Sequence, residues 1–340
     1  MKGRTIALDH VNGFEAAALM VDGRLSDLLI DSEHPRPGAI YRAIADRPVK
    51  GQGGMFLRTP DGSAFLRQIK GLAPGQPILV QVTGYAEPGK ALPVTSKILC
   101  KSRYAIITPS APGLNISRAI KDEDIRDSLL EIAHGEMSDS DMGLILRSSC
   151  AGAEADEIAE DIRAMLDLAS AILADATGEG AEKLTEGDGP HVLAWRDWTE
   201  AAEVVTAEGC FAEHGVLDQI EALSDPQAPL AGGASCFIEP TRALIAVDVN
   251  TGGDASLAAG LKANLATARD LPRQLRLRGL GGQITLDLAP MPKKDRRQFE
   301  TSLRAAFRQD SVETTLVGWT PLGHYELQRK RDRLPLSEVL

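Results

Sequence analysis

Aromatic residues, cysteines and long apolar runs are all scarce in this chain. Aromatic residues make up 4% of the 340 residues, and no apolar run approaches the roughly 18 to 20 residues that a membrane helix needs. The few cysteines are widely spaced and form no Cys-x-x-Cys pair; they are Cys100, Cys150, Cys210 and Cys236. The six histidines are equally dispersed. The sequence therefore predicts neither a membrane span nor a local zinc-binding motif.

An export signal is also missing from the pattern of the N-terminus. The run from Met1 to Asp9 reaches an acid too early for a signal peptide, so we expect an intracellular, cytoplasmic protein. The composition, with 43% hydrophobic and 25% charged residues, is ordinary for a globular protein. A chain of 340 residues exceeds the size at which one core keeps growing, which predicts more than one domain.

The charge is unevenly distributed along the chain. The overall net charge is −11, but residues 262–333 hold 15 Lys and Arg against 8 Asp and Glu, a local excess of +7. The remainder therefore carries −18. This polarity favours an anionic ligand at the C-terminal part. The alternative is that the basic residues form a solvated helix face.

Two short apolar runs each lead into an acid. Residues 242–250 end in Asp248-Val-Asn250, and residues 281–287 end in Asp287. Both runs predict buried strands, and on a strand Asp248 and Asn250 point to the same side. If the two strands are neighbours, two carboxylates and an amide converge, a donor set that suits Mg²⁺. The alternative is ordinary turn chemistry before a Gly-Gly pair.

Several motifs follow one another along this part of the chain. They are Asp248-Val-Asn250, Asn264-Leu265, Arg273 to Arg278, Gly281-Gly282, Asp287 and Arg308-Gln-Asp310. With these motifs, residues 243–336 resemble the catalytic core of the ribonuclease E/G family. The resemblance implies Mg²⁺-dependent cleavage of single-stranded RNA that leaves 5′-phosphate and 3′-hydroxyl ends. In this reading Asp248 and Asp287 bind the metal, and Asn250 positions one of them through a hydrogen bond. Arg276 and Arg278 either hold the RNA backbone or pair with acids in a structural helix.

The resemblance covers nearly the whole chain and implies an α/β multidomain protein. An RNase H-like subdomain is interrupted by an OB-fold barrel and a 5′-sensor segment, and a DNase I-like catalytic subdomain follows. The implied boundaries are 1–35 and 177–231 for the RNase H-like parts, 36–100 for the barrel, 101–176 for the sensor segment and 232–340 for the catalytic part. The residues themselves predict a hairpin at Asp22-Gly23, short barrel strands in 36–100, a helix over 154–176 and a loop over 177–190.

Two further sets of residues take roles from the resemblance. In the barrel, Phe56, Phe65 and Lys90 match the aromatic and lysine positions that hold single-stranded RNA. The alternative places both phenylalanines in the barrel core. In the sensor segment, Arg147 and Ser148 match the pair that binds the 5′-monophosphate of RNA, and a guanidinium with a hydroxyl suits that task. The alternative is a structural arginine at a strand end.

The chain departs from the family pattern at three points, one of which is that we do not expect the C-terminal scaffold tail that recruits partners in some members. Pro290 stands where the family usually has another acid after the second catalytic aspartate. The cysteine motif that shares zinc between subunits is not found, so we expect any homodimer to be independent of zinc. The competing functions are a non-catalytic RNA-binding protein that keeps the fold and a metal phosphodiesterase acting on DNA. The retained Asp248, Asn250 and Asp287 argue against the first, and the barrel-like and sensor-like segments argue against the second.

Overall fold

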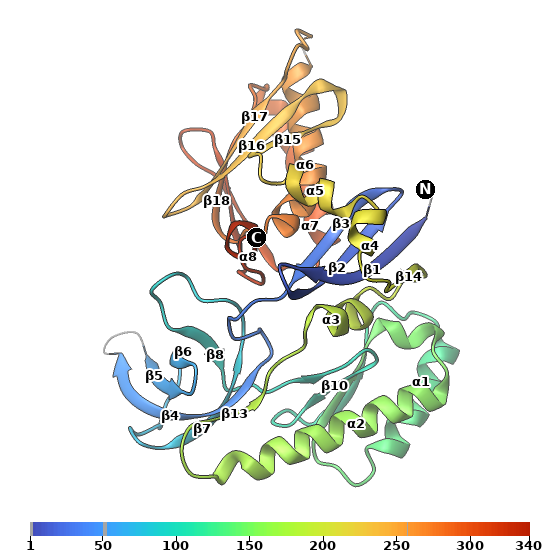
Figure 1. Cartoon of the computed structure of the whole chain (residues 1–340), viewed down its shortest axis with the longest axis vertical. Coiled ribbons are helices and arrows are strands. Elements are labelled where there is room, and N and C mark those ends of the chain that lie inside the picture. The colour runs from blue at the N-terminus through green and yellow to red at the C-terminus, as the bar shows by residue number, and fades with distance from the viewer. Residues whose placement is uncertain (1–2, 50–52, 257) are drawn as a thin grey trace. The chain divides into compact units, whose positions relative to one another are not determined.

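The computed structural model describes residues 3–49, 53–256 and 258–340, which form a mixed α/β structure, as predicted. The chain divides into two compact units (Figure 1). Unit 1 combines Met1–Ser32 with Ala201–Leu340, and unit 2 comprises Glu33–Glu200. None of the described helices is both long enough and apolar enough to cross a membrane.

Unit 2 contains a closed five-stranded barrel with OB-like strand order. Its strands run in the order β4-β5-β6-β8-β7, and pairing of β7 with β4 closes the barrel. The pair β6–β8 is parallel and the other pairs are antiparallel. The bounds of these strands are β4 (Ile40–Val49), β5 (Gly54–Thr59), β6 (Gly62–Leu66), β7 (Pro77–Val82) and β8 (Leu92–Thr95). The barrel predicted for residues 36–100 is therefore present.

The predicted loop over 177–190 is wrong in part, because it contains a strand. Strand β13 (Glu182–Thr185) pairs antiparallel with β4 at the outside of the barrel. Arg42, a buried residue of β4, donates hydrogen bonds to the carbonyl oxygens of Gly180 and Asp175 and pairs with Glu182. Main-chain hydrogen bonds and one buried arginine hold this segment. Because these contacts do not depend on alternating apolar residues, the sequence pattern did not predict the strand.

The rest of unit 2 is a four-stranded sheet packed against two helices. The sheet order is β11-β12-β10-β9, and α1 and α2 bury apolar residues such as Leu129, Ile158 and Ile162 in its core. Helix α2 fulfils the helix prediction for 154–176. The bounds are β9 (Cys100–Lys101), β10 (Ala105–Thr108), β11 (Gly113–Ile116), α1 (Glu123–Glu136), β12 (Gly143–Leu146), η1 (Ser148–Gly152), α2 (Ala155–Ala174), η2 (Asp175–Thr177) and α3 (Pro190–Asp197).

Unit 1 begins with a four-stranded sheet of order β14-β1-β2-β3. The predicted turn between β2 and β3 is present: Asp22 and Gly23 both have positive φ, 50° and 77°, which suits a tight hairpin. Strand β14 pairs in parallel with β1, so a later segment joins the N-terminal hairpin in one sheet. The bounds are β1 (Arg4–Val11), β2 (Phe14–Val21), β3 (Arg24–Ile30), β14 (Glu203–Val205), α4 (Cys210–Glu213), α5 (Val216–Ala222) and α8 (Leu336–Val339).

The larger part of unit 1 is a six-stranded sheet of order β15-β16-β17-β18-β20-β19. Its neighbours β17 and β18 are parallel, and helix α6 connects them. Helices α6 and α7 contribute Ala263, Leu271, Phe299 and Leu303 to the core on one side of the sheet. The bounds are β15 (Gln227–Pro229), η3 (Ala231–Gly233), β16 (Ser235–Pro240), β17 (Ile245–Asn250), α6 (Ala259–Leu277), β18 (Gly282–Asp287), η4 (Lys293–Asp295), α7 (Arg296–Arg308), β19 (Thr314–Trp319) and β20 (Tyr325–Arg329).

All four cysteines are buried free thiols in the cores of these sheets. Burial raises the pKa of Cys100 and Cys150 to about 11 and that of Cys236 to about 12. A buried thiol that keeps its proton is a poor metal ligand and a poor nucleophile. The finer division into RNase H-like and DNase I-like parts stays a prediction.

Candidate active site

The two predicted aspartates are direct neighbours across a pair of parallel strands. Strands β17 and β18 pair so that Asp248 lies opposite Asp287. Each strand alternates buried and exposed residues, and the acids fall at exposed positions while Val247 and Leu286 are buried. The sheet side that carries the acids is therefore opposite the side packed against α6 and α7. The sequence predicts both the strands and the shared side correctly.

Asn250 contacts the first of these aspartates as predicted. Its amide Nδ2 donates a hydrogen bond of 2.9 Å to Asp248 Oδ2. Both residues belong to β17 and are two positions apart, so their side chains leave the strand on the same side. A donated hydrogen bond fixes the orientation of the carboxylate while leaving its other oxygen available.

A histidine that the sequence analysis did not select stands beside the second aspartate. His324 Nε2 lies 3.7 Å from Asp287 Oδ1. The residue precedes β20, the antiparallel neighbour of β18, and a turn fixes its backbone: its carbonyl accepts from Thr320 N and its N–H donates to Thr320 Oγ1. Only the strand order brings it to Asp287, because 36 positions separate the two residues in the sequence.

A buried asparagine holds the chain just beyond Asp287. The side chain of Asn264 on α6 is fully buried, donates 2.8 Å to Ala289 O and accepts 3.0 Å from Ala289 N. Close packing adds to this restraint, because a Cβ on Gly260 would lie 1.9 Å from Pro290 O. The resemblance marked Asn264 as a matching residue, and the structure shows what it contacts. Pro290 is exposed and offers no carboxylate at this point of the chain.

The chemistry of these donors fits a divalent ion held by two carboxylates. Within the described residues, no Lys or Arg nitrogen lies within 4.0 Å of Asp248 or Asp287, so the protein leaves both charges uncompensated. Mg²⁺ prefers oxygen donors, retains several waters and needs only one or two carboxylates. Across the same residues, no cluster of three or more His, Cys, Asp or Glu side chains is arranged to enclose a metal.

The two arginines predicted to hold RNA are engaged inside unit 1. Arg276 pairs with Asp310 and donates to Ser26 O, and its side chain is 14% exposed. Arg278 is buried and donates to the carbonyl oxygens of Leu223 and Asp225. The Arg276 contact matches the alternative raised from the sequence, pairing with an acid, whereas Arg278 is held by main-chain carbonyl oxygens instead. Their RNA-binding role stays a prediction without a contact to support it.

The barrel phenylalanines lie outside the barrel core. Phe56 and Phe65 are directly paired on β5 and β6, with ring centroids 5.3 Å apart, and each falls between two core residues of its strand. The Arg47 guanidinium lies 5.2 Å from the centre of the Phe56 ring. The core alternative is therefore wrong. Lys90 lies between β7 and β8, where its ammonium pairs with Glu87 at 2.8 Å.

The two residues of the predicted 5′-phosphate site differ in their contacts: Arg147 is engaged by neighbouring groups, and Ser148 is exposed. The Arg147 guanidinium donates to Ser102 O at 2.7 Å and Arg196 O at 3.1 Å, and pairs with Asp197 at 2.6 Å. Ser148 is exposed at the first position of η1. Arg147 therefore already organises the surrounding backbone, whereas Ser148 is open to solvent.

Comparison with known proteins places this geometry in a family. The model of the Ribonuclease E/G family matches residues 100–207 and 193–332. Ribonuclease G of Salmonella typhimurium is 27% identical, with 98% of this chain and 81% of that protein covered. Ribonuclease E of a Nostoc species is also 27% identical, with 96% and 56% covered. For ribonuclease E of Escherichia coli the identity is 28%, with 78% and 29% covered.

The chain thus spans about half, or less, of the length of these ribonuclease E relatives. It spans most of the ribonuclease G relative. The family model covers more than half of the chain, including the strands that carry Asp248 and Asp287. This chain belongs to the ribonuclease E/G family.

Proposed function

We propose that the chain is an Mg²⁺-dependent endoribonuclease that cleaves single-stranded RNA to 5′-phosphate and 3′-hydroxyl ends, in RNA processing or decay in the cytoplasm. The observation that carries the proposal is the adjacent, exposed pair of Asp248 and Asp287 without a cationic partner among the described residues. Membership of the ribonuclease E/G family supports the substrate class.

The chain's own residues would prepare the site for this reaction. Asp248 and Asp287 would hold the ion, which when bound supplies Lewis acidity and lowers the pKa of a bound water. Asn250 keeps Asp248 in one orientation, and Asn264 fixes the backbone beyond Asp287. The acids stand on the side of the sheet away from α6 and α7, which leaves them open to an RNA backbone.

The proposal includes two roles for unit 2. Phe56 and Phe65 present a paired aromatic surface on which successive bases of a single strand can stack. Lys90, in the loop between β7 and β8, would supply a positive charge for the RNA backbone. Arg147 and Ser148 would receive a 5′-monophosphate, with Ser148 as the accessible donor. If so, 5′-monophosphorylated RNA is cut faster than 5′-hydroxyl RNA, and Ser148→Ala narrows the difference; equal rates in the unaltered protein would reject this role.

The deciding experiment is incubation of the chain with a 5′-labelled single-stranded oligoribonucleotide, with and without Mg²⁺. We expect internal cuts that require the ion and products that a ligase specific for 5′-phosphate ends accepts. Binding without cutting would favour the non-catalytic alternative, for which the missing acid at Pro290 is the specific observation. A matched single-stranded DNA provides the third arm, and faster cleavage of DNA would favour the phosphodiesterase.

The proposal includes that any homodimer of the chain is independent of zinc. The four cysteines are buried in three hydrophobic cores, Cys100 and Cys150 in the same one, and thus cannot form a shared surface site without unfolding. Light scattering before and after chelation tests this, and zinc whose removal splits a dimer would contradict it.

A further inference from the structure

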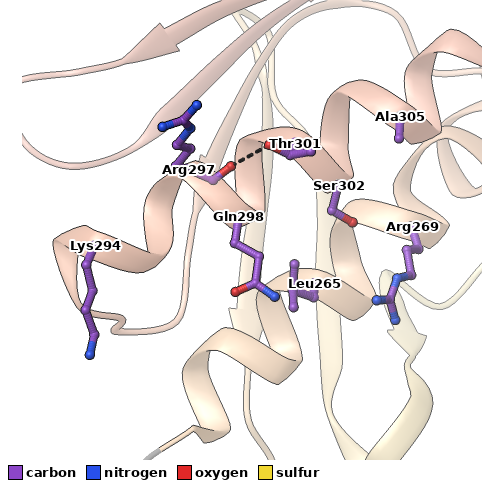
Figure 2. Close-up of a pocket in the computed structure, with 8 residues that line it drawn as sticks. All are labelled: Leu265, Arg269, Lys294, Arg297, Gln298, Thr301, Ser302 and Ala305. Carbon is purple, nitrogen blue, oxygen red and sulfur yellow. Dashed lines mark hydrogen bonds between the residues drawn. The ribbon is translucent and has the colours of Figure 1, made fainter.

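A shallow groove runs between helices α6 and α7 of unit 1. Its volume is about 560 Å³, and it is lined by Leu265, Arg269, Lys294, Arg297, Gln298, Thr301, Ser302 and Ala305 (Figure 2). Because these helices pack on the sheet side opposite Asp248 and Asp287, the groove is separate from the candidate active site.

The groove lining includes three cations and no acid, and in Figure 2 the guanidinium of Arg297 points away from Gln298 and Leu265. Arg269, Lys294 and Arg297 are exposed, and none of them lies within 4.0 Å of a carboxylate in the part of the chain that the structure describes. On the same helix as Arg269, Arg273 and Arg276 pair with acids. The groove cations therefore produce an uncompensated positive potential along one surface, which attracts a polyanion.

The remaining lining suits a phosphodiester chain better than a compact anion. Figure 2 shows Lys294 and Arg269 at opposite ends, with Gln298, Leu265 and Ser302 between them. Lys294 and Arg269 are therefore separated along the groove, which suits a ligand that carries a phosphate at each of several successive positions. The amide and hydroxyl side chains can donate to phosphate or ribose oxygens, and Leu265 offers an apolar contact to sugar or base.

We propose that the groove between α6 and α7 binds the sugar–phosphate backbone of the RNA strand at a second site, remote from the cleavage position. The identification of the ligand as RNA rests on the proposed function. Three of the basic residues in 262–333 line this groove, whereas buried Arg278 and Arg329 and partly buried Arg276 are engaged by the protein itself. A long strand that reaches both sites binds more tightly than a short one.

The experiment compares two variants of equal charge. The groove variant carries Arg269→Gln, Lys294→Gln and Arg297→Gln. The control carries Arg242→Gln, Arg304→Gln and Arg308→Gln, three exposed arginines outside the groove lining. Binding of a long and a short fluorescent oligoribonucleotide is measured by anisotropy in chelator, so that no cleavage occurs, over a range of salt concentrations.

We expect the groove variant to weaken binding of the long RNA by at least about tenfold and to lower the salt slope by about 2, since each lost phosphate contact removes about 0.7 for a single strand. The control should change the slope by less than about 1. Equal effects in both variants, or tighter competition by polyglutamate than by RNA, would overturn the inference.

Cleavage assays with Mg²⁺ separate this inference from the proposed function. If the groove variant cuts long RNA with unchanged affinity, the second site is rejected and the endonuclease proposal stands. If the unaltered chain binds RNA through the groove but never cuts it, the second site stands and the endonuclease proposal fails. Absence of RNA binding by the unaltered chain overturns the groove inference in either case.

Discussion

Unit 1 holds two sets of acids whose surroundings are opposite. The side chain of Asp310 is fully buried and contacts both Arg276 and Arg329, while buried Asp27 contacts Arg333 and Arg276. Asp248 and Asp287 are exposed, and their side-chain neighbours are an amide and a histidine.

The difference shows how the fold assigns acids to structure or to chemistry. A buried carboxylate must have its charge balanced by the protein, because desolvation alone disfavours the ion. For Asp27, burial opposes ionisation, but Arg333 and Arg276 keep its pKa below the ordinary value of 3.8. The two exposed carboxylates on adjacent strands have no such partner among the described residues, and in the proposed function a cation from solution would balance them.

The largest expected effect follows from disturbing the buried set. Asp310→Asn leaves Arg276 and Arg329 without their shared counter-charge, and removal of one partner from a buried pair costs about 3–5 kcal/mol. Chemical denaturation should show this loss in the free energy of unfolding of unit 1. Glu313→Gln, at an exposed acid, serves as the control and should cost less than about 0.5 kcal/mol. Similar losses in both variants would mean that Asp310 is not the centre of the buried set.

Substitution in the exposed set should affect the reaction and spare stability. Asp287→Asn removes a charge proposed to hold the ion, and we expect RNA cleavage to fall by at least about 10²–10³-fold. The free energy of unfolding should not fall, because Asp287 is exposed and the substitution also removes like-charge repulsion with Asp248. Glu239→Gln, at an exposed acid of β16 in the same sheet, is the matched control. Full activity of Asp287→Asn would reject the catalytic assignment.

An intermediate loss of cleavage is expected at Asn264, which holds the backbone of Ala289, two residues after Asp287. Asn264→Ala leaves both polar groups of Ala289 without their partner, at a cost of about 1–3 kcal/mol per unsatisfied group. Cleavage should fall less than in Asp287→Asn, with kcat affected more than KM. Thr267→Val changes an equally buried residue of α6 whose hydroxyl bonds only to Ala263 O. If both variants reduce cleavage equally, Asn264 has no specific positioning role.

The smallest effect concerns Asp197 of unit 2, which is partly exposed yet paired. Burial would raise its pKa, but Arg196, Lys101 and Arg147 hold it at about 2, below the ordinary value of 3.8. A lowered pKa stabilises the folded state above about pH 4, and this stabilisation is lost as the pH falls towards 2. Between about pH 4 and 2, the free energy of unfolding should therefore depend less on pH in Asp197→Asn than in the unaltered protein. The same pH dependence of the free energy of unfolding in both proteins would contradict this.

The sequence predicts the elements better than it predicts the partners of individual side chains. The Asp22-Gly23 hairpin, the helix over 154–176 and the strands ending in Asn250 and Asp287 follow from local signals, since turn residues and apolar periodicity act over a few positions. By contrast, the contacts of Arg276 and His324 depend on which strands become neighbours, information that no local pattern contains. For the same reason the barrel was predictable and the attachment of β13 to it was not.

Helix α6 couples the unfolding of the two sheets of unit 1. Its Ala263 and Leu271 belong to the core of the six-stranded sheet, while Leu277 belongs to the core of the four-stranded sheet, and Arg273 donates to Leu25 O. Neither sheet can lose the helix without exposing the other's apolar residues. Amide protons in β1 and β18 should therefore exchange through one cooperative opening, with a shared sensitivity to denaturant, although 270 positions separate the last residue of β1 from the first of β18 along the chain.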